Sequence, residues 1–161
     1  MAYALFMNRT EQAQTIINIA EKYLGIPYAY GAYRNTKPEE EPKGFDCSFF
    51  THHVFTQAIG KALPLSSLEQ AAEAYKRGAE VTDLDAAQTG DLLFFRGSRG
   101  HYNDDLFDGR EILIGHVGIY IKETAEIIHA QSAKGVVREK LADAQIRVPN
   151  AYRITFIGNY F

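Results

Sequence analysis

The chain has 161 residues, 46% of them hydrophobic and 12% aromatic, so it is long enough to bury a core as a single domain covering 1–161. Its net charge of −3 argues against sequence-independent binding to nucleic acid, which needs a basic face. The single cysteine excludes an intramolecular disulfide and cysteine-rich zinc sites. No stretch reaches the roughly 18 apolar residues that a membrane span requires.

The first residues, MAYALFMNRTEQ, form a short apolar patch. They lack the basic region, the long apolar segment and the small-residue cleavage site of a signal peptide, so we do not interpret them as one. Localisation stays open, because a cytoplasmic protein, a non-classically delivered protein and an exported protein whose signal is absent from this chain share this pattern.

Three helices are predicted from apolar side chains at helical spacing and from capping residues. They cover 9–25, 46–60 and 66–78. The expected N-cap residues are Thr10, Asp46, and either Ser66 or Ser67. A turn-rich loop over 25–46 joins the first two helices, and its NTKPEEEPKG segment indicates a solvated surface insertion.

The second half of the chain changes to short segments rich in β-branched and aromatic residues. The predicted strands lie in DLLFF, HVGIYI, EIIHA, GVVRE and YRITFIGNYF. Helices followed by strands favour an α+β fold in which an antiparallel sheet packs on the N-terminal helices.

Cys47 lies in the first turn of the second predicted helix, directly after Asp46. A lone cysteine is usually a small buried hydrophobe. At a helix N-terminus, however, unpaired N–H groups and the helix dipole lower the pKa of a thiol. A polar loop over 31–46 also leads up to Cys47, so its thiol can face a groove. These features suggest a nucleophile, which requires a base.

Two of the five histidines, His116 and His129, fall inside predicted strands. If the turn at 122–125 pairs residue 121 with residue 126, the two histidines share one face as diagonal neighbours about 7–8 Å apart. Gly118 then opposes His129 and leaves room for its ring. A slip of one residue would place the two histidines on opposite faces.

In this arrangement His116 would take the thiol proton and His129 would orient the imidazole of His116. Gln131, opposite His116, is an alternative orienting residue. A zinc site with two histidines and an aspartate is a further alternative, although no third ligand is evident. His52 and His53 are expected in packed or solvated positions. His101 is expected in a solvated loop, with contact to substrate as the alternative.

The motifs YLGIPYAYGAY, GFDCSFF, GDLLFF, GHVGIYI and IIHAQSAKGVV occur in an order and spacing that resemble the NlpC-type papain-like cysteine peptidases of bacterial cell walls. The resemblance extends over 11–158, nearly the whole chain. It implies a papain-like α+β fold with catalytic residues Cys47, His116 and His129. It also implies that Tyr28 lies near the oxyanion position.

By the same resemblance, Asp46 and Ser48 help to hold the free amino end of a short peptide. The implied substrates are peptidoglycan or muropeptide fragments, cleaved after D-γ-glutamate and before a diamino acid. No metal or organic cofactor is implied, and no protein partner is indicated. Alternatives are a Cys–His amidase or acyltransferase acting on another amide or ester, and a binding protein that retains the fold without catalysis.

The sequence departs from the usual family pattern at three places. Gly31-Ala32 replaces the typical Gly-Gly, and Phe49 replaces a small residue after the DCS motif. Residues 34–43 and 97–111 look like insertions. These departures affect the expected surroundings of the cleft more than its chemistry.

Overall fold

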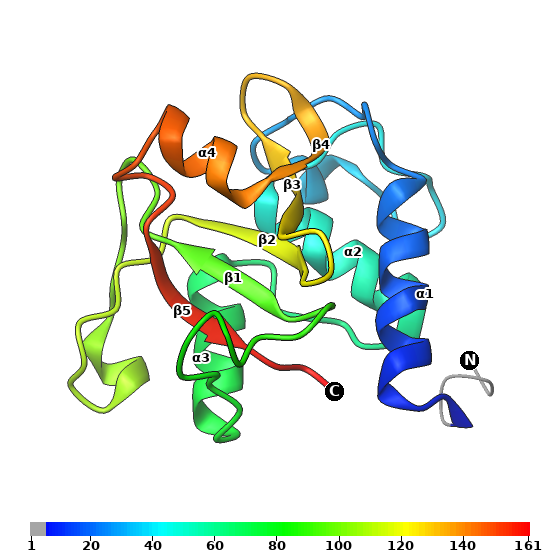
Figure 1. The fold of residues 1–161 in the computed structure, drawn as a ribbon. Coiled ribbons are helices and arrows are strands. Elements are labelled where there is room, and N and C mark those ends of the chain that lie inside the picture. Colours follow the sequence, from blue (N-terminus) through cyan, green and yellow to red (C-terminus); the bar gives the residue numbers. More distant parts are fainter. Residues whose placement is uncertain (1–5) are drawn as a thin grey trace.

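The computed structural model describes residues 6–161, so residues 1–5 of the N-terminal patch lie outside the described part. A five-stranded antiparallel sheet forms the centre, in the order β4-β3-β2-β1-β5 (Figure 1). The helices are α1 (Arg9–Glu21), α2 (Cys47–Ile59), α3 (Ser67–Lys76) and α4 (Leu141–Arg147). The strands are β1 (Leu92–Phe95), β2 (His116–Ile121), β3 (Glu126–Gln131), β4 (Gly135–Lys140) and β5 (Ile154–Gly158). The predicted α+β fold is confirmed.

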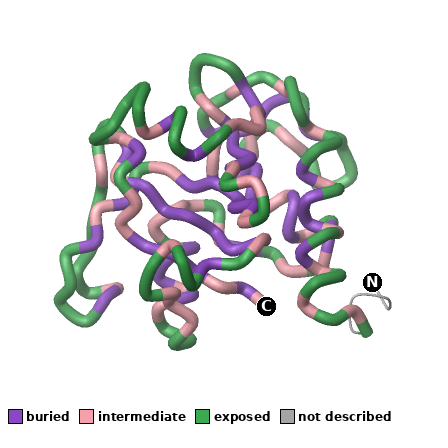
Figure 2. Tube along the Cα trace, in the orientation of Figure 1, coloured by how far each residue is buried: buried purple, intermediate pink, exposed green. Residues whose placement is uncertain are grey.

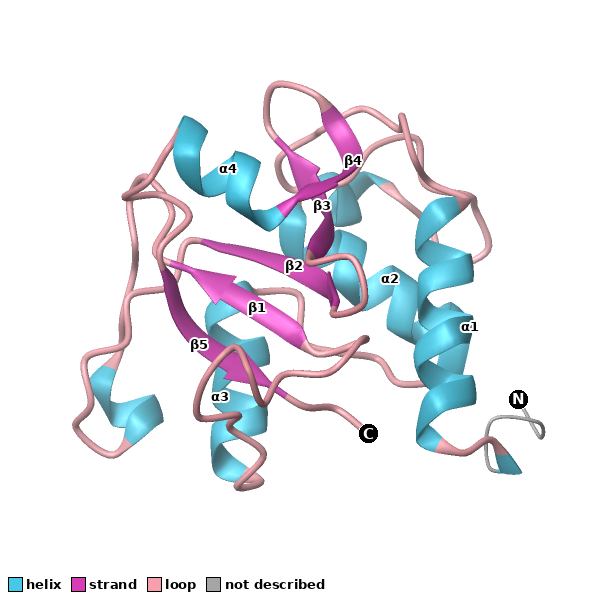
Figure 3. Cartoon of the chain, in the orientation of Figure 1, coloured by secondary structure: helices cyan, strands magenta, loops and turns pink. Residues whose placement is uncertain are grey.

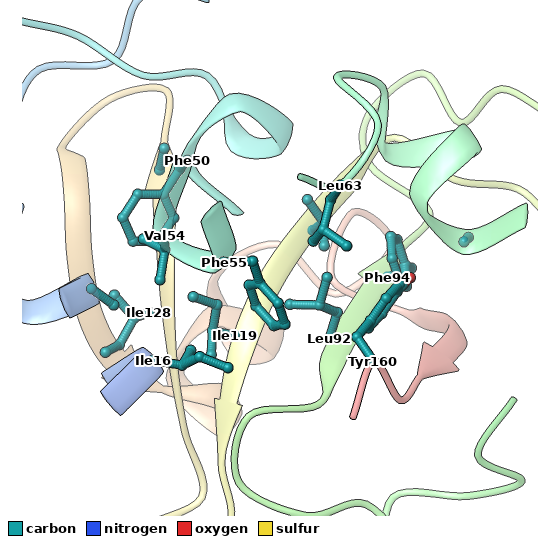
Figure 4. Close-up of a cluster of buried hydrophobic side chains, with 14 of the residues drawn as sticks. Ile16, Phe50, Val54, Phe55, Leu63, Leu92, Phe94, Ile119, Ile128 and Tyr160 are labelled. Atoms are coloured by element: carbon teal, nitrogen blue, oxygen red, sulfur yellow. The ribbon is translucent and has the colours of Figure 1, made fainter. Parts of the chain in front are cut away.

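The two faces of the sheet carry separate apolar clusters. The larger cluster joins α1, α2 and α3 to one face, and Phe55, Ile119 and Leu92 of this cluster lie side by side in Figure 4. The smaller cluster joins α4 to the opposite face through Leu141 and Ala144. The strands are therefore buried along most of their length, whereas exposed segments gather in the connecting loops (Figure 2).

Helix α1 begins two residues earlier than a Thr10 cap would allow. The N-cap is Asn8, whose side chain accepts a hydrogen bond from the Glu11 N–H at 3.0 Å, while the Glu11 carboxylate accepts from the Asn8 N–H at 2.9 Å. This reciprocal capping box satisfies two free N–H groups at once. The prediction of Thr10 as cap was therefore wrong, because it did not consider the pairing with Glu11.

Helix α2 has the predicted boundaries. Asp46 is the N-cap and accepts a hydrogen bond from the Phe49 N–H at 2.8 Å. Gly60 ends the helix with φ of 70°, a left-handed conformation that glycine adopts without steric cost. Of the two residues expected to cap α3, the N-cap is Ser66.

The chain after β4 contains an element that was not predicted. Helix α4 follows Lys140 directly and has only seven residues, with Leu141 and Ala144 buried. So short a segment has too little apolar periodicity to be recognised. Residues 97–111 are mainly loop with one short 3-10 helix, Asp104–Phe107 (Figure 3). Among residues 6–161, no helix has the length and apolar character needed to cross a membrane.

Candidate active site

Cys47 is the first residue of α2 and lines a cleft of about 420 Å³. The same cleft is lined by Tyr28, Asp46 and Ser48, the three residues expected to contact substrate or oxyanion. A second hollow of about 290 Å³ is lined by His116 and also by Tyr28. Because both hollows are lined by Tyr28 and Gly115, they adjoin, with Cys47 in one and His116 in the other.

The two predicted insertions border or neighbour this cleft. Arg34, from the first insertion, and His101, from the second, are both exposed and both line the hollow that contains Cys47. A larger hollow of about 630 Å³ lies beside it, among residues of the 29–44 segment, and contains neither Cys47 nor a histidine. The candidate active site is therefore recognised by the presence of Cys47, and not by the volume of the hollow.

His116 and His129 lie on one face of the sheet, as the hairpin register predicted. Ile121 pairs with Glu126, which is the expected alignment of β2 and β3. His116 Nε2 and His129 Nδ1 are 2.7 Å apart and share a hydrogen bond. A Cβ on Gly118 would lie 3.2 Å from the Cβ of His129, so glycine gives the His129 ring its space.

Glu139 on β4 continues this line of side chains, and the sequence analysis did not identify it. His129 Nε2 and Glu139 Oε1 are 2.8 Å apart. Arg147 donates two further hydrogen bonds to the same carboxylate, at 2.8 and 2.9 Å. The hydrogen bonds from His129 and then Arg147 lower the pKa of Glu139 to about 2.

Gln131, the alternative orienting residue, is engaged elsewhere. Its Oε1 accepts a hydrogen bond from the Ala133 N–H at 2.9 Å, within the turn that follows β3. The alternative of a zinc site finds no third ligand, since residues 6–161 contain no group of three His, Cys, Asp or Glu side chains arranged to hold a metal ion.

The protein environment keeps both the thiol and the imidazole neutral. Burial raises the pKa of Cys47 to about 12, and the negative charge of Asp46 adds to the rise. Backbone hydrogen bonds, including one from Val117, lower this pKa by a smaller amount. Burial likewise moves the pKa of His116 well below its usual value. The N–H groups at the helix N-terminus thus lower the thiol pKa as predicted, but desolvation outweighs them and the net shift is upward.

A neutral resting pair predicts a specific pH dependence of thiol alkylation. We expect the rate of Cys47 modification by iodoacetamide to keep rising from about pH 7 to about pH 10, because the thiolate is scarce throughout this range. The measurement is the mass increase of the intact protein over time, and with one cysteine in the chain it reports on Cys47 alone. A rate that is already constant at about pH 6 would instead indicate a preformed thiolate–imidazolium pair.

Tyr28 is brought to the cleft by a parallel bridge between its backbone and that of Phe45. Burial, followed by the charges of Cys47 and Asp46, raises the pKa of Tyr28 to about 12. The phenol therefore keeps its proton at neutral pH. It can donate a hydrogen bond to a developing negative charge in the cleft.

Asp46 and Ser48 both have structural hydrogen bonds in addition to their place in the cleft. The second carboxylate oxygen of Asp46 accepts from the Gly31 N–H at 2.9 Å. The Ser48 hydroxyl donates to the Leu65 carbonyl at 2.7 Å. Asp46 thus ties the loop before it to the start of α2, and Ser48 ties α2 to the segment before α3.

The three remaining histidines lie apart from the His116–His129 pair. His52 contacts the Leu63 carbonyl through its Nδ1, and His53 Nε2 lies 2.8 Å from the hydroxyl of Tyr23. His101 is exposed on the second insertion and pairs through its backbone with Ile114. Packed positions for the first two and a solvated position for His101 agree with the prediction.

The chain is similar in sequence to proteins named as peptidases. The chain is 34% identical over 116 residues to a probable endopeptidase of Haemophilus influenzae, covering 72% of this chain and 57% of that protein. It is 34% identical over 109 residues to a gamma-D-glutamyl-L-lysine dipeptidyl-peptidase of Bacillus subtilis, covering 68% of this chain and 29% of that protein. The matches thus cover less than two thirds of the length of either relative.

The fold has solved counterparts. The NlpC/p60 domain of the peptidoglycan hydrolase SagA superposes with a TM-score of 0.63 and 26% identity, covering 92% of this chain and 98% of that one. The profile of the NlpC/P60 family matches residues 25–148, a segment that contains Cys47, His116, His129 and Glu139. The chain therefore belongs to the NlpC/P60 family.

Proposed function

We propose that this protein is a cysteine endopeptidase that hydrolyses peptidoglycan stem peptides at the amide between D-γ-glutamate and the following diamino acid. The observations that carry the proposal are a cleft lined by Cys47 at a helix N-terminus and an adjoining hollow lined by His116, which shares a hydrogen bond with the buried His129. Relatives named as endopeptidases and as gamma-D-glutamyl-L-lysine peptidases support the choice of bond.

In the proposed reaction, His116 takes the proton of Cys47 as the sulfur attacks the amide carbonyl carbon. The carbonyl oxygen becomes an oxyanion, which the Cys47 N–H and the Tyr28 hydroxyl stabilise by donating hydrogen bonds. His116 then gives its proton to the leaving amine, and a thioester remains on Cys47. Water, deprotonated by His116, hydrolyses the thioester and restores the thiol.

Asp46 and Ser48 are proposed to bind the free amino end of the peptide. Both oxygens of Asp46 already accept backbone N–H groups, from Phe49 and Gly31. A carboxylate has about four lone-pair positions, so a further ammonium donor is compatible with these bonds. Because the same carboxylate also supports the loop, its negative charge is held in a defined position.

The test is product analysis by mass spectrometry with L-Ala-γ-D-Glu-diaminopimelate and its L-lysine counterpart. We expect release of the L-Ala-γ-D-Glu dipeptide and the free diamino acid. Two matched controls are the α-linked glutamyl isomer, which should remain intact, and the N-acetylated peptide, which should be cleaved more slowly because it cannot pair with Asp46.

Three results would contradict parts of this proposal. Cleavage of the α-linked isomer at the same rate would refute the γ-glutamyl specificity. Transfer of the acyl group to an added amine without hydrolysis would indicate an acyltransferase. Intact peptides together with a Cys47 that iodoacetamide does not modify at any pH would indicate a protein that keeps the fold without catalysis.

A further inference from the structure

We propose that Glu139 is a positioning residue that sets the tautomer of His129 and, through it, the tautomer of His116. In this arrangement the unprotonated ring nitrogen of His116 is Nδ1, the nitrogen not used in the bond to His129. The inference rests on the proposed function, since it specifies how the same site presents its base. It extends the predicted nucleophile, base and orienting residue by a fourth side chain.

The hydrogen-bonding capacity of each group determines where the protons lie. An ionised carboxylate only accepts hydrogen bonds, so the 2.8 Å contact with Glu139 requires a proton on His129 Nε2. In its neutral form the imidazole of His129 carries this one N–H, and its Nδ1 is then an acceptor. The 2.7 Å contact with His116 then requires the proton on His116 Nε2. The lone pair of His116 is left on Nδ1, where it can receive a proton.

Arg147 keeps Glu139 in the accepting form. Its two terminal nitrogens donate to the two carboxylate oxygens of Glu139, and the oxygen facing His129 also receives the second of these bonds. Such a paired arrangement is the strong form of the arginine–carboxylate contact. Protonating Glu139 would remove an acceptor from Arg147, so the carboxylate remains charged across the neutral range.

The surroundings prevent solvent from setting the tautomer instead. His129 has 0% of its surface exposed. The Tyr152 ring packs edge-on against both histidines, with ring centres 5.7 Å from each. Among residues 6–161, Tyr152 and Glu139 contact the pair, Arg147 pairs with Glu139, and Cys47 acts electrostatically on Tyr152. The hydrogen bond at His129 Nε2 is the one to Glu139.

The four-residue line is assembled by the hairpin and the helix that follows it. His129 lies on β3 and Glu139 on β4, which pairs with β3 along its whole length. Arg147 is the last residue of α4, which begins directly after β4 and is anchored by Leu141 and Ala144. A single continuous segment therefore supplies the orienting groups.

The first test measures the tautomers without any substrate, by nitrogen-15 NMR of the histidine side chains at about pH 7.5. Neutral histidine nitrogens with and without a proton have well-separated shifts, and single His→Gln variants assign the rings. In the wild type we expect a proton on Nε2 of both His116 and His129. The opposite tautomer at either ring would overturn the proposal, whatever peptide the protein cleaves.

The second test compares Glu139→Leu, Glu139→Gln and the control Glu126→Gln. Glu126 also pairs with an arginine, Arg138, at 2.9 Å on the same sheet, whereas the side-chain hydrogen bonds of His129 are to His116 and Glu139. We expect Glu139→Leu to mix the tautomers and to lower kcat/KM by about 10–100-fold, mainly through kcat. The control Glu126→Gln should leave the histidine tautomers and kcat/KM unchanged.

Glu139→Gln distinguishes the effect of the hydrogen-bond acceptor on the tautomers from the effect of the negative charge on the pKa of His116. Its amide oxygen can still accept from His129, so the tautomers should persist. The negative charge of Glu139 raises the pKa of His116, so its removal should move the acidic limb of the kcat/KM profile to lower pH. If Glu139→Leu matched the control in NMR and kinetics, the proposal would be refuted. If Glu139→Leu did not fold, the role of Glu139 would be tested by the wild-type tautomers and by the pH profile of kcat/KM for Glu139→Gln.

Failure of this inference differs visibly from failure of the proposed function. Peptides left intact by a protein with the expected tautomers would refute the substrate and keep the role of Glu139. Cleavage of the γ-linked peptide by a Glu139→Leu variant as active as the control would keep the substrate and refute the role of Glu139.

Discussion

Replacing Cys47 by serine is expected to reduce cleavage of the γ-glutamyl peptide by roughly 10⁴-fold or more, close to the rate without enzyme. A hydroxyl ionises far less readily than a thiol, and the acceptor here is His116, whose pKa is already lowered by burial. The serine hydroxyl would therefore stay protonated. The measurement is the initial rate of dipeptide release, followed by mass spectrometry.

The matched control for this change is Gln57→Ala. Gln57 lies on the same helix α2 and is exposed, away from Cys47 along the helix. It should leave the rate unchanged, and both variants should unfold at denaturant concentrations close to that of the wild type. Retention of a substantial rate by Cys47→Ser would exclude Cys47 as the nucleophile and would require another group in the cleft.

Replacing Gly135 by alanine is expected to lower the free energy of unfolding by about 2–5 kcal/mol. Gly135 has φ of 77°, in the region that L side chains rarely adopt. A Cβ at this position would lie 2.3 Å from the carbonyl oxygen of Ile26, far inside contact distance. That oxygen also accepts the hydrogen bond from the Val136 N–H at 2.9 Å, so it cannot move away freely.

Gly78→Ala measures the cost of the positive φ alone, without the steric contact that a Cβ at Gly135 would make. Gly78 also has positive φ, 66°, but a Cβ there would meet nothing within 4 Å. It should therefore cost only the conformational part, about 1–2 kcal/mol. Urea unfolding of both variants provides the comparison. A Gly135→Ala protein no less stable than Gly78→Ala would show that the contact with Ile26 does not constrain the β3–β4 turn.

The sequence contained enough information for the elements that depend on neighbouring residues. Asp46 and Gly60 marked the two ends of α2 because capping and the left-handed turn act within one helical turn. The four-residue turn between β2 and β3 set the register, and the register placed His116 and His129 on one face. Helix α4 was missed because seven residues with two buried positions carry little periodic signal.

The rest of the site depends on groups that are distant in sequence or on burial. Glu139 reaches His129 only through the pairing of β3 with β4, and Arg147 reaches Glu139 only because α4 turns back over the sheet. The pKa of the Cys47 thiol also depends on long-range packing. The sequence predicts the helix N-terminus, which lowers this pKa, but it does not predict the burial that raises it by more. Local capping and turn chemistry therefore placed Cys47 at a helix N-terminus and the two histidines on one face, whereas long-range packing determines their protonation and orientation.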